Sequence, residues 1–287
     1  MVSIILSGGL GNQMFQFAAA KALALRLDTG LMLDLSFIDQ HRKKSWSRPY
    51  ELDIFSHSAN IKKRKANLNR IFIYIIPSLN KKPIGRWILS LFKYYCENDN
   101  INFLSLTNGT TLFGYFTSEI FFKQYRDEIL SEFTFKYPFN TYCQEKSNEI
   151  ENCNSVSVHI RRGDYLNENN SNIYFHCSPE WYLEAIQLMS QKIGSSVFYF
   201  FSDDITWAQE NFSFLTNSRF IDTNHGSNSF NDMRLMSLCK HNIIANSTFS
   251  WWGAWMNKNE NKIVIAPKYY YKNSPKPNFT PENWVLL

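Results

Sequence analysis

The chain has 287 residues, of which 44% are hydrophobic and 16% aromatic, enough to build one large or two ordinary packed domains. This composition excludes a disordered protein, and no apolar run reaches the ~20 residues needed to cross a bilayer. The net charge of +5 is uneven, because residues 41–86 carry a net +10 and the rest of the chain carries −5.

The first thirty residues predict a strand followed by a helix. Residues 2–6 form a short apolar run, and residues 14–27 show helical spacing of apolar residues. Between them, "SGGLGNQ" predicts a turn whose glycines let the backbone approach a ligand, although an ordinary tight connection also favours glycine. The polar side chains of Asn12 and Gln13 favour a binding site. No basic segment precedes the apolar run, so we expect a strand and not a signal peptide.

The next hundred residues give weaker patterns. A second strand is predicted at 30–36, a third at 110–116 and a helix over 118–133, and the polar stretch 138–154 is predicted to be a linker. The basic clusters between residues 41 and 86 stand beside apolar residues and suit either a solvated face or an anionic membrane surface. No nucleic-acid-binding motif accompanies them, so we expect no nucleic-acid partner.

From residue 153 onward, strands and helices alternate. Such alternation predicts parallel βαβ units in a doubly wound sheet, with ligands at the carboxyl ends of the strands. We therefore expect an α/β protein of two Rossmann-like halves that face a cleft. The strands and helices are predicted, in chain order, from the segments "SVSVHI", "SPEWYLEAIQLMSQKI", "SVFYFFSDD", "ITWAQENF", "SRFID", "SFNDMRLMSLCK", "HNIIAN", "STFSWWGAWMNK" and a final "KIVIAP".

Polar residues follow four of these strands where each one ends. They are His159, Arg161 and Arg162 after the first, Asp203 and Asp204 after the second, Asp222 after the third, and Asn246, Ser247, Thr248 and Phe249 after the fourth. Because parallel strands present their carboxyl ends at one edge, we expect these residues to form one site.

An arginine and a helix N-terminus together suit a diphosphate. The side chains of His159 and Arg161 share one face of their strand, and a guanidinium binds phosphate through a fixed fork of donors. Arg161 could instead form a structural ion pair with Asp164, and Arg162 could simply brace its loop through the same residue. The hydroxyls of Ser247 and Thr248 stand at a predicted helix start, where they could bind an anion or act as ordinary caps.

The carboxylates leave alternatives open. Asp203 and Asp204 are adjacent and therefore point to opposite faces, a poor geometry for one shared metal ion, so we expect no metal. Asp222, and after it Asp203 and Asp204, could accept hydrogen bonds from a guanine, although either of the latter two could cap the following helix. Five cysteines without C-x-x-C spacing indicate neither a disulfide framework nor a zinc site and favour a reducing cytoplasm.

The sequence resembles glycosyltransferase family 11, the α-1,2-fucosyltransferases. The resemblance rests on "GGLGNQMFQFAAAKALA", "RPYELDIF", "HIRRGDY", "FSDDITW" and "NSTFSWWGAWM", which span nearly the whole chain. It implies a GT-B fold, with residues 1–145 as an acceptor-side domain carrying a basic insertion at 41–100 and residues 146–287 as the GDP-fucose-binding domain. It also implies metal-independent, inverting transfer of L-fucose from GDP-β-L-fucose to the 2-hydroxyl of a terminal β-galactoside, with no cofactor.

The resemblance also implies roles for individual residues. It places the β-phosphate on Arg161, the diphosphate and ribose beside His159, and the phosphates and base on Ser247, Thr248 and Phe249. The glycine loop with Gly9 and Gly11 would line the cleft. There Asn12 would stand beside the reacting sugar, and Asn12 and Gln13 would orient sugar hydroxyls.

Several points stay open at this stage. A base could be Asp34, Asp39, Glu51, Asp53 or Glu119, and spacing does not choose among them. Other readings are a GDP-fucose transferase with another acceptor or linkage, a non-catalytic nucleotide or glycan reader, and a membrane- or RNA-surface protein. We expect a role in surface polysaccharide (O-antigen) synthesis, with a hypothetical peripheral contact to the anionic inner-membrane face. No pattern predicts an oligomeric state.

Overall fold

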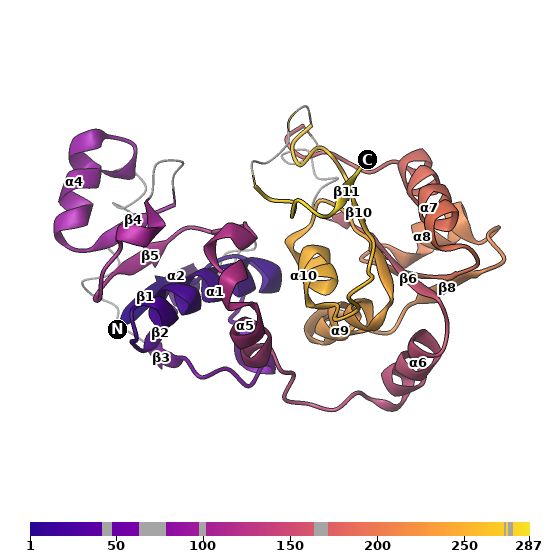
Figure 1. Ribbon diagram of the computed structural model, residues 1–287, viewed down its shortest axis with the longest axis horizontal. Coiled ribbons are helices and arrows are strands. Elements are labelled where there is room, and N and C mark those ends of the chain that lie inside the picture. Colours follow the sequence, from indigo (N-terminus) through magenta and orange to yellow (C-terminus); the bar gives the residue numbers. More distant parts are fainter. Residues whose placement is uncertain (42–47, 63–78, 98–101, 164–171, 273, 275–277) are drawn as a thin grey trace. The chain divides into compact units, whose positions relative to one another are not determined.

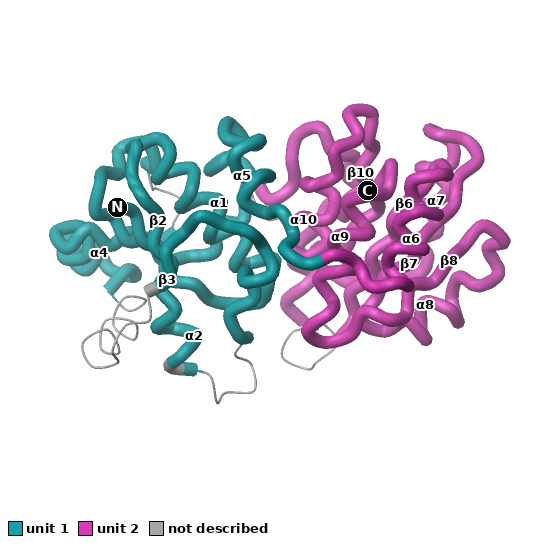
Figure 2. The backbone as a smooth tube through the Cα atoms, turned by 90° about the horizontal axis from the view of Figure 1, so that it is seen from below, with its two compact units in different colours: residues 1–137 teal, residues 138–287 magenta. Residues whose placement is uncertain are grey.

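The computed structural model describes residues 1–41, 48–62, 79–97, 102–163, 172–272, 274 and 278–287. The chain divides into two compact units, residues 1–137 (unit 1) and 138–287 (unit 2), which Figure 2 draws in different colours. The predicted boundary after residue 145 comes slightly later and falls within a helix of unit 2.

Unit 1 contains a parallel sheet with the strand order β3-β2-β1-β5-β4 (Figure 1). Its strands are β1 (Val2–Ile5), β2 (Leu31–Asp34), β3 (Asn60–Lys62), β4 (Tyr94–Cys96) and β5 (Thr111–Phe113). The chain runs from β1 outward to β3 and later returns on the other side of β1. The order of the strands therefore reverses between β1 and β5.

The described helices of unit 1 are α1 (Leu10–Arg26), α2 (Ser36–His41), α4 (Pro83–Leu91) and α5 (Arg126–Glu132). Helix α1 packs against β1 and β2 and starts four residues before the predicted residue 14, because extended Gly9 caps it and "LGNQ" forms its first turn. The helix predicted over 118–133 is instead two 3-10 turns, Glu119–Phe121 and Lys123–Tyr125, followed by α5.

Unit 2 contains a parallel sheet with the strand order β11-β10-β9-β6-β7-β8. Its strands are β6 (Ser155–Ile160), β7 (Val197–Ser202), β8 (Ser218–Ile221), β9 (His241–Ile243), β10 (Val264–Ala266) and β11 (Val285–Leu286). All strands predicted after residue 153 are confirmed. The prediction that "KIVIAP" is the final strand is wrong, because the two residues of β11 are too short to produce a pattern.

Helices cover both faces of this sheet. They are α6 (Thr141–Glu151), α7 (Pro179–Ile193), α8 (Ile205–Phe212), α9 (Phe230–Leu238) and α10 (Thr248–Met256). Helices α7 and α8 share an apolar core with β6, β7, β9 and β10. On the other face Asn242 of β9 donates to the carbonyl oxygen of Met236 in α9, and α9 packs against α10. All six residues of β6 are buried, as expected for a central strand with both faces covered.

The predicted linker at 138–154 is wrong, because most of it folds as α6. Asn140 caps this helix by accepting a hydrogen bond from the backbone N–H of Cys143 at 2.8 Å. Cys143, Ser147 and Ile150 are buried at helical spacing, and α6 packs against α9. Because this helix has so few apolar positions, its sequence resembles that of a loop.

The buried indole rings of α10 pack against one another in a cluster. The ring of Trp251 stacks on Trp255 with centroids 6.0 Å apart and contacts Trp252 edge-on at 5.1 Å. Trp284, just before β11, closes the cluster at 5.5 Å from Trp251. These rings anchor the helix that follows β9.

Much of the predicted basic insertion, residues 42–47 and 63–78, lies outside the described residues. Among the helices that the structure describes, none is both long and apolar enough to pass through a bilayer.

Candidate functional site

The unit 2 sheet reverses its strand order between β6 and β9. From β6 the chain continues to β7 and β8 on one side, and it later crosses to β9 and β10 on the other. Ligands of open parallel sheets bind outside the carboxyl ends of the strands at such a reversal. The segments that leave β6 and β9 there are Arg161–Arg162 and Asn246–Phe249.

Arg161 is fixed by a carboxylate from the neighbouring strand. Its Nη1 lies 2.9 Å from Oδ2 of Asp203, and both side chains are 26% exposed. The other oxygen of Asp203 accepts a hydrogen bond from the backbone N–H of Arg162 at 2.9 Å. A β-carbon at Gly163 would come within 2.5 Å of Asp203, so this close approach requires glycine. Arg161 thus forms an ion pair with Asp203, and the alternative pair with Asp164 stays a prediction because Asp164 lies outside the described residues.

Arg162 and Asp204 form a separate bracing group. Nε of Arg162 lies 3.0 Å from Oδ2 of Asp204, and the guanidinium lies 4.1 Å from the ring centre of Trp207. Asp204 also caps α8 by accepting from the backbone N–H of Trp207 at 3.2 Å. The capping alternative is therefore confirmed for Asp204, whereas Arg162 pairs with Asp204 and its predicted partner, Asp164, lies outside the described residues. Their predicted contact with the donor stays a prediction.

His159 is buried in β6 and is neutral. Burial, and secondarily the charge of Arg161, lower the pKa of this imidazole to about 3. Its Nδ1 is buried without a hydrogen-bond partner among the residues that the structure describes, and its ring lies 5.7 Å from that of Phe249. A buried polar atom of this kind indicates a position where a ligand atom can be bound.

The N-terminus of α10 follows β9 directly. Ser247 is its cap, with Oγ accepting from the backbone N–H of Phe249 at 3.3 Å, so the capping alternative is confirmed. Thr248 and Phe249 are half-buried in the first turn. The backbone N–H groups of such a turn point outward and favour an anion.

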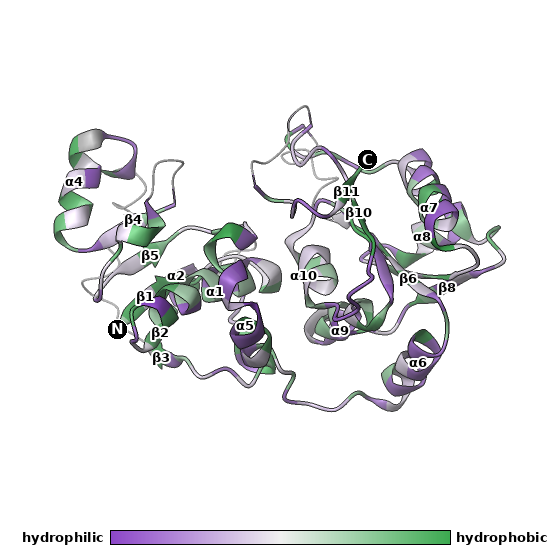
Figure 3. Cartoon of the chain, in the orientation of Figure 1, coloured by the Kyte–Doolittle hydropathy of each residue, from purple (hydrophilic) through white to green (hydrophobic). Residues whose placement is uncertain are grey.

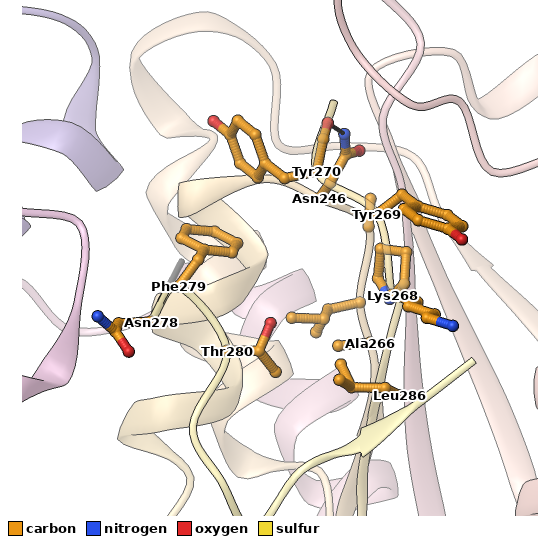
Figure 4. A pocket seen from close by; sticks show the side chains of 12 residues that line it. Asn246, Ala266, Lys268, Tyr269, Tyr270, Asn278, Phe279, Thr280 and Leu286 are labelled. Atoms are coloured by element: carbon orange, nitrogen blue, oxygen red, sulfur yellow. Dashed lines mark hydrogen bonds between the residues drawn. The ribbon is translucent and has the colours of Figure 1, made fainter. Parts of the chain in front are cut away.

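Asn246 connects two loops beside this turn. Its amide nitrogen donates to the carbonyl oxygens of Phe175 and Tyr270, each at 2.9 Å. It also lines a cavity of about 200 Å³ at the carboxyl ends of β9 and β10, which Figure 4 shows with Tyr270 above it and Thr280 within it. The described side chain of Asn246 thus positions loops.

Asp222 lies apart from this group. It follows β8, at the edge of the sheet and two strands from β6, and its side chain is 51% exposed. Its carboxylate lies 3.5 Å from Nε2 of His225. The strand order thus separates Asp222 from Arg161, which the spacing along the sequence could not reveal.

In unit 1 the glycine loop leaves β1 and starts α1. Gly8 has a φ of +74°, and a β-carbon there would lie 2.7 Å from Nδ2 of Asn12, so glycine is required. Gly11 is buried in the first turn of α1, and Asn12 is half-buried. Asn12 therefore stands over the end of β1, next to the strand reversal.

Gln13 is fully buried and structural. Its amide nitrogen donates to the carbonyl oxygens of Gly8 at 2.8 Å and Pro49 at 2.7 Å, and its oxygen accepts from the backbone N–H of Glu51 at 3.0 Å. The first bond closes the turn within "GGLGNQ", and the other two join this motif to "RPYELDIF". Gln13 therefore positions the loop, and the contact of Asn12 and Gln13 with sugar hydroxyls stays a prediction.

Gln16, one helical turn later, also joins separate segments through its side-chain amide, and the sequence analysis did not predict it. It donates to Ser7 Oγ at 3.0 Å and to the carbonyl oxygen of Gly114 at 2.9 Å, and it accepts from the backbone N–H of Ser7. It thereby joins the ends of β1 and β5. An amide on the apolar face of a helix, three residues after another amide, is the signal that could have revealed it.

The structure distinguishes the five carboxylates that the sequence offers as candidate bases. Asp39 and Asp53 are exposed, and buried Asp34 accepts from the backbone N–H of Ser36 at 3.0 Å. Glu119 pairs electrostatically with Arg126.

Glu51 lies against the start of α1. Its Oε2 is 3.6 Å from the position that a β-carbon of Gly9 would occupy. Burial raises the pKa of its carboxyl against the opposing effects of Arg48 and of the Leu10 backbone N–H. Of the five, Glu51 is the carboxylate that lies beside the glycine loop.

In the described part of the chain, no group of three His, Cys, Asp or Glu side chains could hold a metal ion.

Comparison with known proteins agrees with this geometry. The chain is similar to the "O-antigen biosynthesis glycosyltransferase WbnK" of Escherichia coli, with 35% identity over 98% of this chain and 99% of the relative. It is similar to an "Alpha-1,2-colitosyltransferase" of Escherichia coli, with 33% identity over 98% and 97%. It is 27% identical to "Galactoside alpha-(1,2)-fucosyltransferase 2" of Hylobates lar, over 93% of this chain and 72% of the relative.

Solved structures and a family model complete the comparison. The fold is similar to that of the fucosyltransferase NodZ from Bradyrhizobium, with a TM-score of 0.51 and 12% identity over 88% of this chain and 92% of that one. The predicted GT-B class, with a parallel α/β sheet in each half, is confirmed. The model of "Glycosyl transferase family 11" matches residues 1–287. The chain therefore belongs to glycosyltransferase family 11.

Proposed function

We propose that this glycosyltransferase moves L-fucose from GDP-β-L-fucose to the 2-hydroxyl of a terminal β-galactoside, with inversion at the anomeric carbon. The observation that carries the proposal is Arg161, held by Asp203 at the strand reversal of unit 2 and followed across the sheet by the N-terminus of α10. A diphosphate bound there would meet a guanidinium and a turn of backbone N–H groups. The names of the relatives support an α-1,2 linkage and a product in surface polysaccharide.

In this mechanism the protein stabilises a leaving group. The bond between the anomeric carbon and the β-phosphate oxygen breaks, and negative charge develops on the GDP. Arg161 and the first turn of α10 neutralise that charge without a metal ion. Neutral His159 contributes hydrogen bonding and not a proton, because its pKa is about 3.

The acceptor side is assigned to unit 1. The acceptor oxygen attacks the anomeric carbon, and its proton passes to the carboxylate of Glu51. Asn12 orients the acceptor from the first turn of α1. The support for Glu51 is its position against Gly9 and its elevated pKa, which makes it a stronger base than an ordinary glutamate.

The test is GDP release from GDP-fucose in EDTA, with and without lactose, followed by NMR assignment of the product linkage. An α-1,2-fucosylated product formed in EDTA supports donor, linkage and metal independence together. Hydrolysis of GDP-fucose without transfer to lactose would support the proposed donor and contradict the proposed acceptor. Failure to bind GDP would overturn the site built on Arg161.

A second candidate donor follows from one relative. The 33% identity to an alpha-1,2-colitosyltransferase extends over nearly the whole chain, so GDP-activated colitose is the competing donor. The two donors should be compared at equal concentration with the same acceptor. A higher kcat/KM with the colitose donor would replace fucose in the proposal and leave the diphosphate site unchanged.

A further inference from the structure

Helix α4 presents an apolar surface to the outside of unit 1. Ile84, Trp87, Leu91 and the following Phe92 are 68%, 61%, 61% and 61% exposed. Positions 84, 87 and 91 are three and four residues apart and therefore share one helical face. The four side chains lie within nine residues, whereas the other exposed large apolar side chains of the described chain are more widely spaced along the sequence.

This face is turned away from the core. The buried side of α4 is Leu89, 2% exposed, which belongs to an apolar cluster with Ile5 and Cys96. Around the helix, residue 89 stands well away from the arc of 84, 87 and 91 at 100° per residue. The helix is thus anchored by one side while its most apolar side stays exposed. Figure 3 shows apolar and polar residues on different parts of α4.

The charge around α4 has one sign. Residues 79–96 contain Lys81, Lys82, Arg86 and Lys93 and no Asp or Glu. Lys81, Lys82 and Arg86 are exposed. A short helix with Trp, Phe and aliphatic residues on one side and cations beside them has the chemistry of a helix that lies in the interface of an anionic bilayer.

We propose that α4 is a membrane-docking helix, which inserts Ile84, Trp87 and Leu91 between the headgroups of anionic lipids while the flanking cations contact the phosphates. The occupant is a lipid surface, because exposed cations stand at both ends of the apolar helix face, Lys81 and Lys82 before it and Lys93 after it, where they can reach anionic headgroups. With nine residues, α4 lies along the surface and does not cross it. The proposal does not depend on the identity of donor or acceptor.

The experiment is co-sedimentation of the full chain with vesicles of phosphatidylcholine, with and without phosphatidylglycerol, at low and high salt. We expect the anionic vesicles to bind at least about tenfold more tightly, with binding reduced by salt. The double variant W87S/L91S should weaken binding about tenfold or more. The variant K81Q/K82Q/R86Q should abolish the preference for anionic lipid. F214S, which removes a side chain 65% exposed in unit 2, is the matched control and should bind like the parent chain.

A second readout locates the contact. Brominated lipids quench only indoles within the bilayer, and Trp87 is the exposed indole on α4, so quenching should occur in the parent chain and disappear in W87F. GDP release with a soluble acceptor verifies that each variant is folded. Absence of binding to anionic vesicles at low salt, or equal binding by W87S/L91S, would overturn the proposal. So would a change of oligomeric state in W87S/L91S without loss of lipid binding, because the face would then bind a second copy.

Discussion

Asp203 holds Arg161 across two neighbouring strands, with Nη1 and Oδ2 2.9 Å apart, and holds the next backbone N–H through its other oxygen. One carboxylate therefore fixes both the side chain and the main chain of the segment that leaves β6. The orientation of the guanidinium is set before any ligand arrives, which lowers the cost of ordering it on binding.

Substitution of Arg161 by Lys should separate charge from geometry. Lysine keeps the positive charge but lacks the planar fork, so we expect kcat/KM to fall about 100-fold and GDP affinity to weaken. Asp203→Asn should cost less, about tenfold, because Arg161 stays present but loses its fixed partner. Steady-state GDP release and calorimetric titration with GDP measure both. Glu210→Gln on the exposed side of α8 is the control, and equal losses in all three variants would contradict the assignment.

Substitutions of the adjacent residues Gln13 and Asn12 should have different effects on stability and activity. Gln13→Leu leaves two part-buried carbonyl oxygens and one part-buried backbone N–H without their protein partner, so we expect the free energy of unfolding to fall by about 1–3 kcal/mol. Asn12→Ala should change it by less than about 0.5 kcal/mol and yet lower kcat about 100-fold. Urea denaturation and kinetics distinguish them. A destabilised Asn12→Ala would show that Asn12 also supports the loop.

Glu51→Gln tests the proposed base through pH. Because burial raises its pKa, the carboxylate that accepts the proton is lost as pH falls through a value above that of an ordinary glutamate. The parent enzyme should therefore show an acid limb in kcat/KM at that raised value. Glu51→Gln should lack this limb and lose about 10²- to 10⁴-fold in kcat. Asp53→Asn, at an exposed neighbouring position, should keep both the acid limb and the parent kcat. Persistence of the acid limb in Glu51→Gln would exclude Glu51 as the base.

Asp232 should make unit 2 less stable as pH rises. Burial raises the pKa of this carboxyl to about 7, with a smaller contribution from Asp222, while the hydrogen bond from Asn224 at 2.7 Å opposes the shift. The folded state therefore holds a proton that the unfolded state releases near the ordinary aspartate pKa of 3.8. Stability is fully present below that value and falls as pH rises to about 7, by on the order of 4 kcal/mol. Asp232→Asn should flatten this part of the pH dependence in denaturation curves. An unchanged slope would mean that another group is responsible.

The sequence predicted unit 2 well because β6 and β7 have six residues each and strands alternate regularly with helices after residue 153. The β-branched residues of β6 and the aromatic run in β7 indicate strands and not loops. Ser178, followed by Pro179, marks the start of α7. In unit 1 the strands β3 and β4 were not predicted, because each has three residues and lies in a region without regular alternation of strands and helices. The helix α6 was hidden by its polar surface.

The site was predictable in its members but not in its pairing. A pattern shows that Arg161, Asp203 and Asp222 each follow a strand, whereas only the order of strands shows that Asp203 is adjacent to Arg161 and Asp222 is not. Two of the bonds of Gln13 join segments 36 and 38 positions apart, and no local pattern encodes such a contact.

The indole cluster around α10 gives unit 2 an optical signature of its own. The ring centroids of Trp251, Trp252, Trp255 and Trp284 lie 5.1 to 6.0 Å from that of a neighbouring indole, close enough for their transitions to couple in the near ultraviolet. Among the described residues of unit 1, Trp87 is the single tryptophan, and it is exposed. The near-ultraviolet circular dichroism of these coupled indoles therefore follows the packing around α10, so that the melting of this part of unit 2 can be monitored in the intact chain.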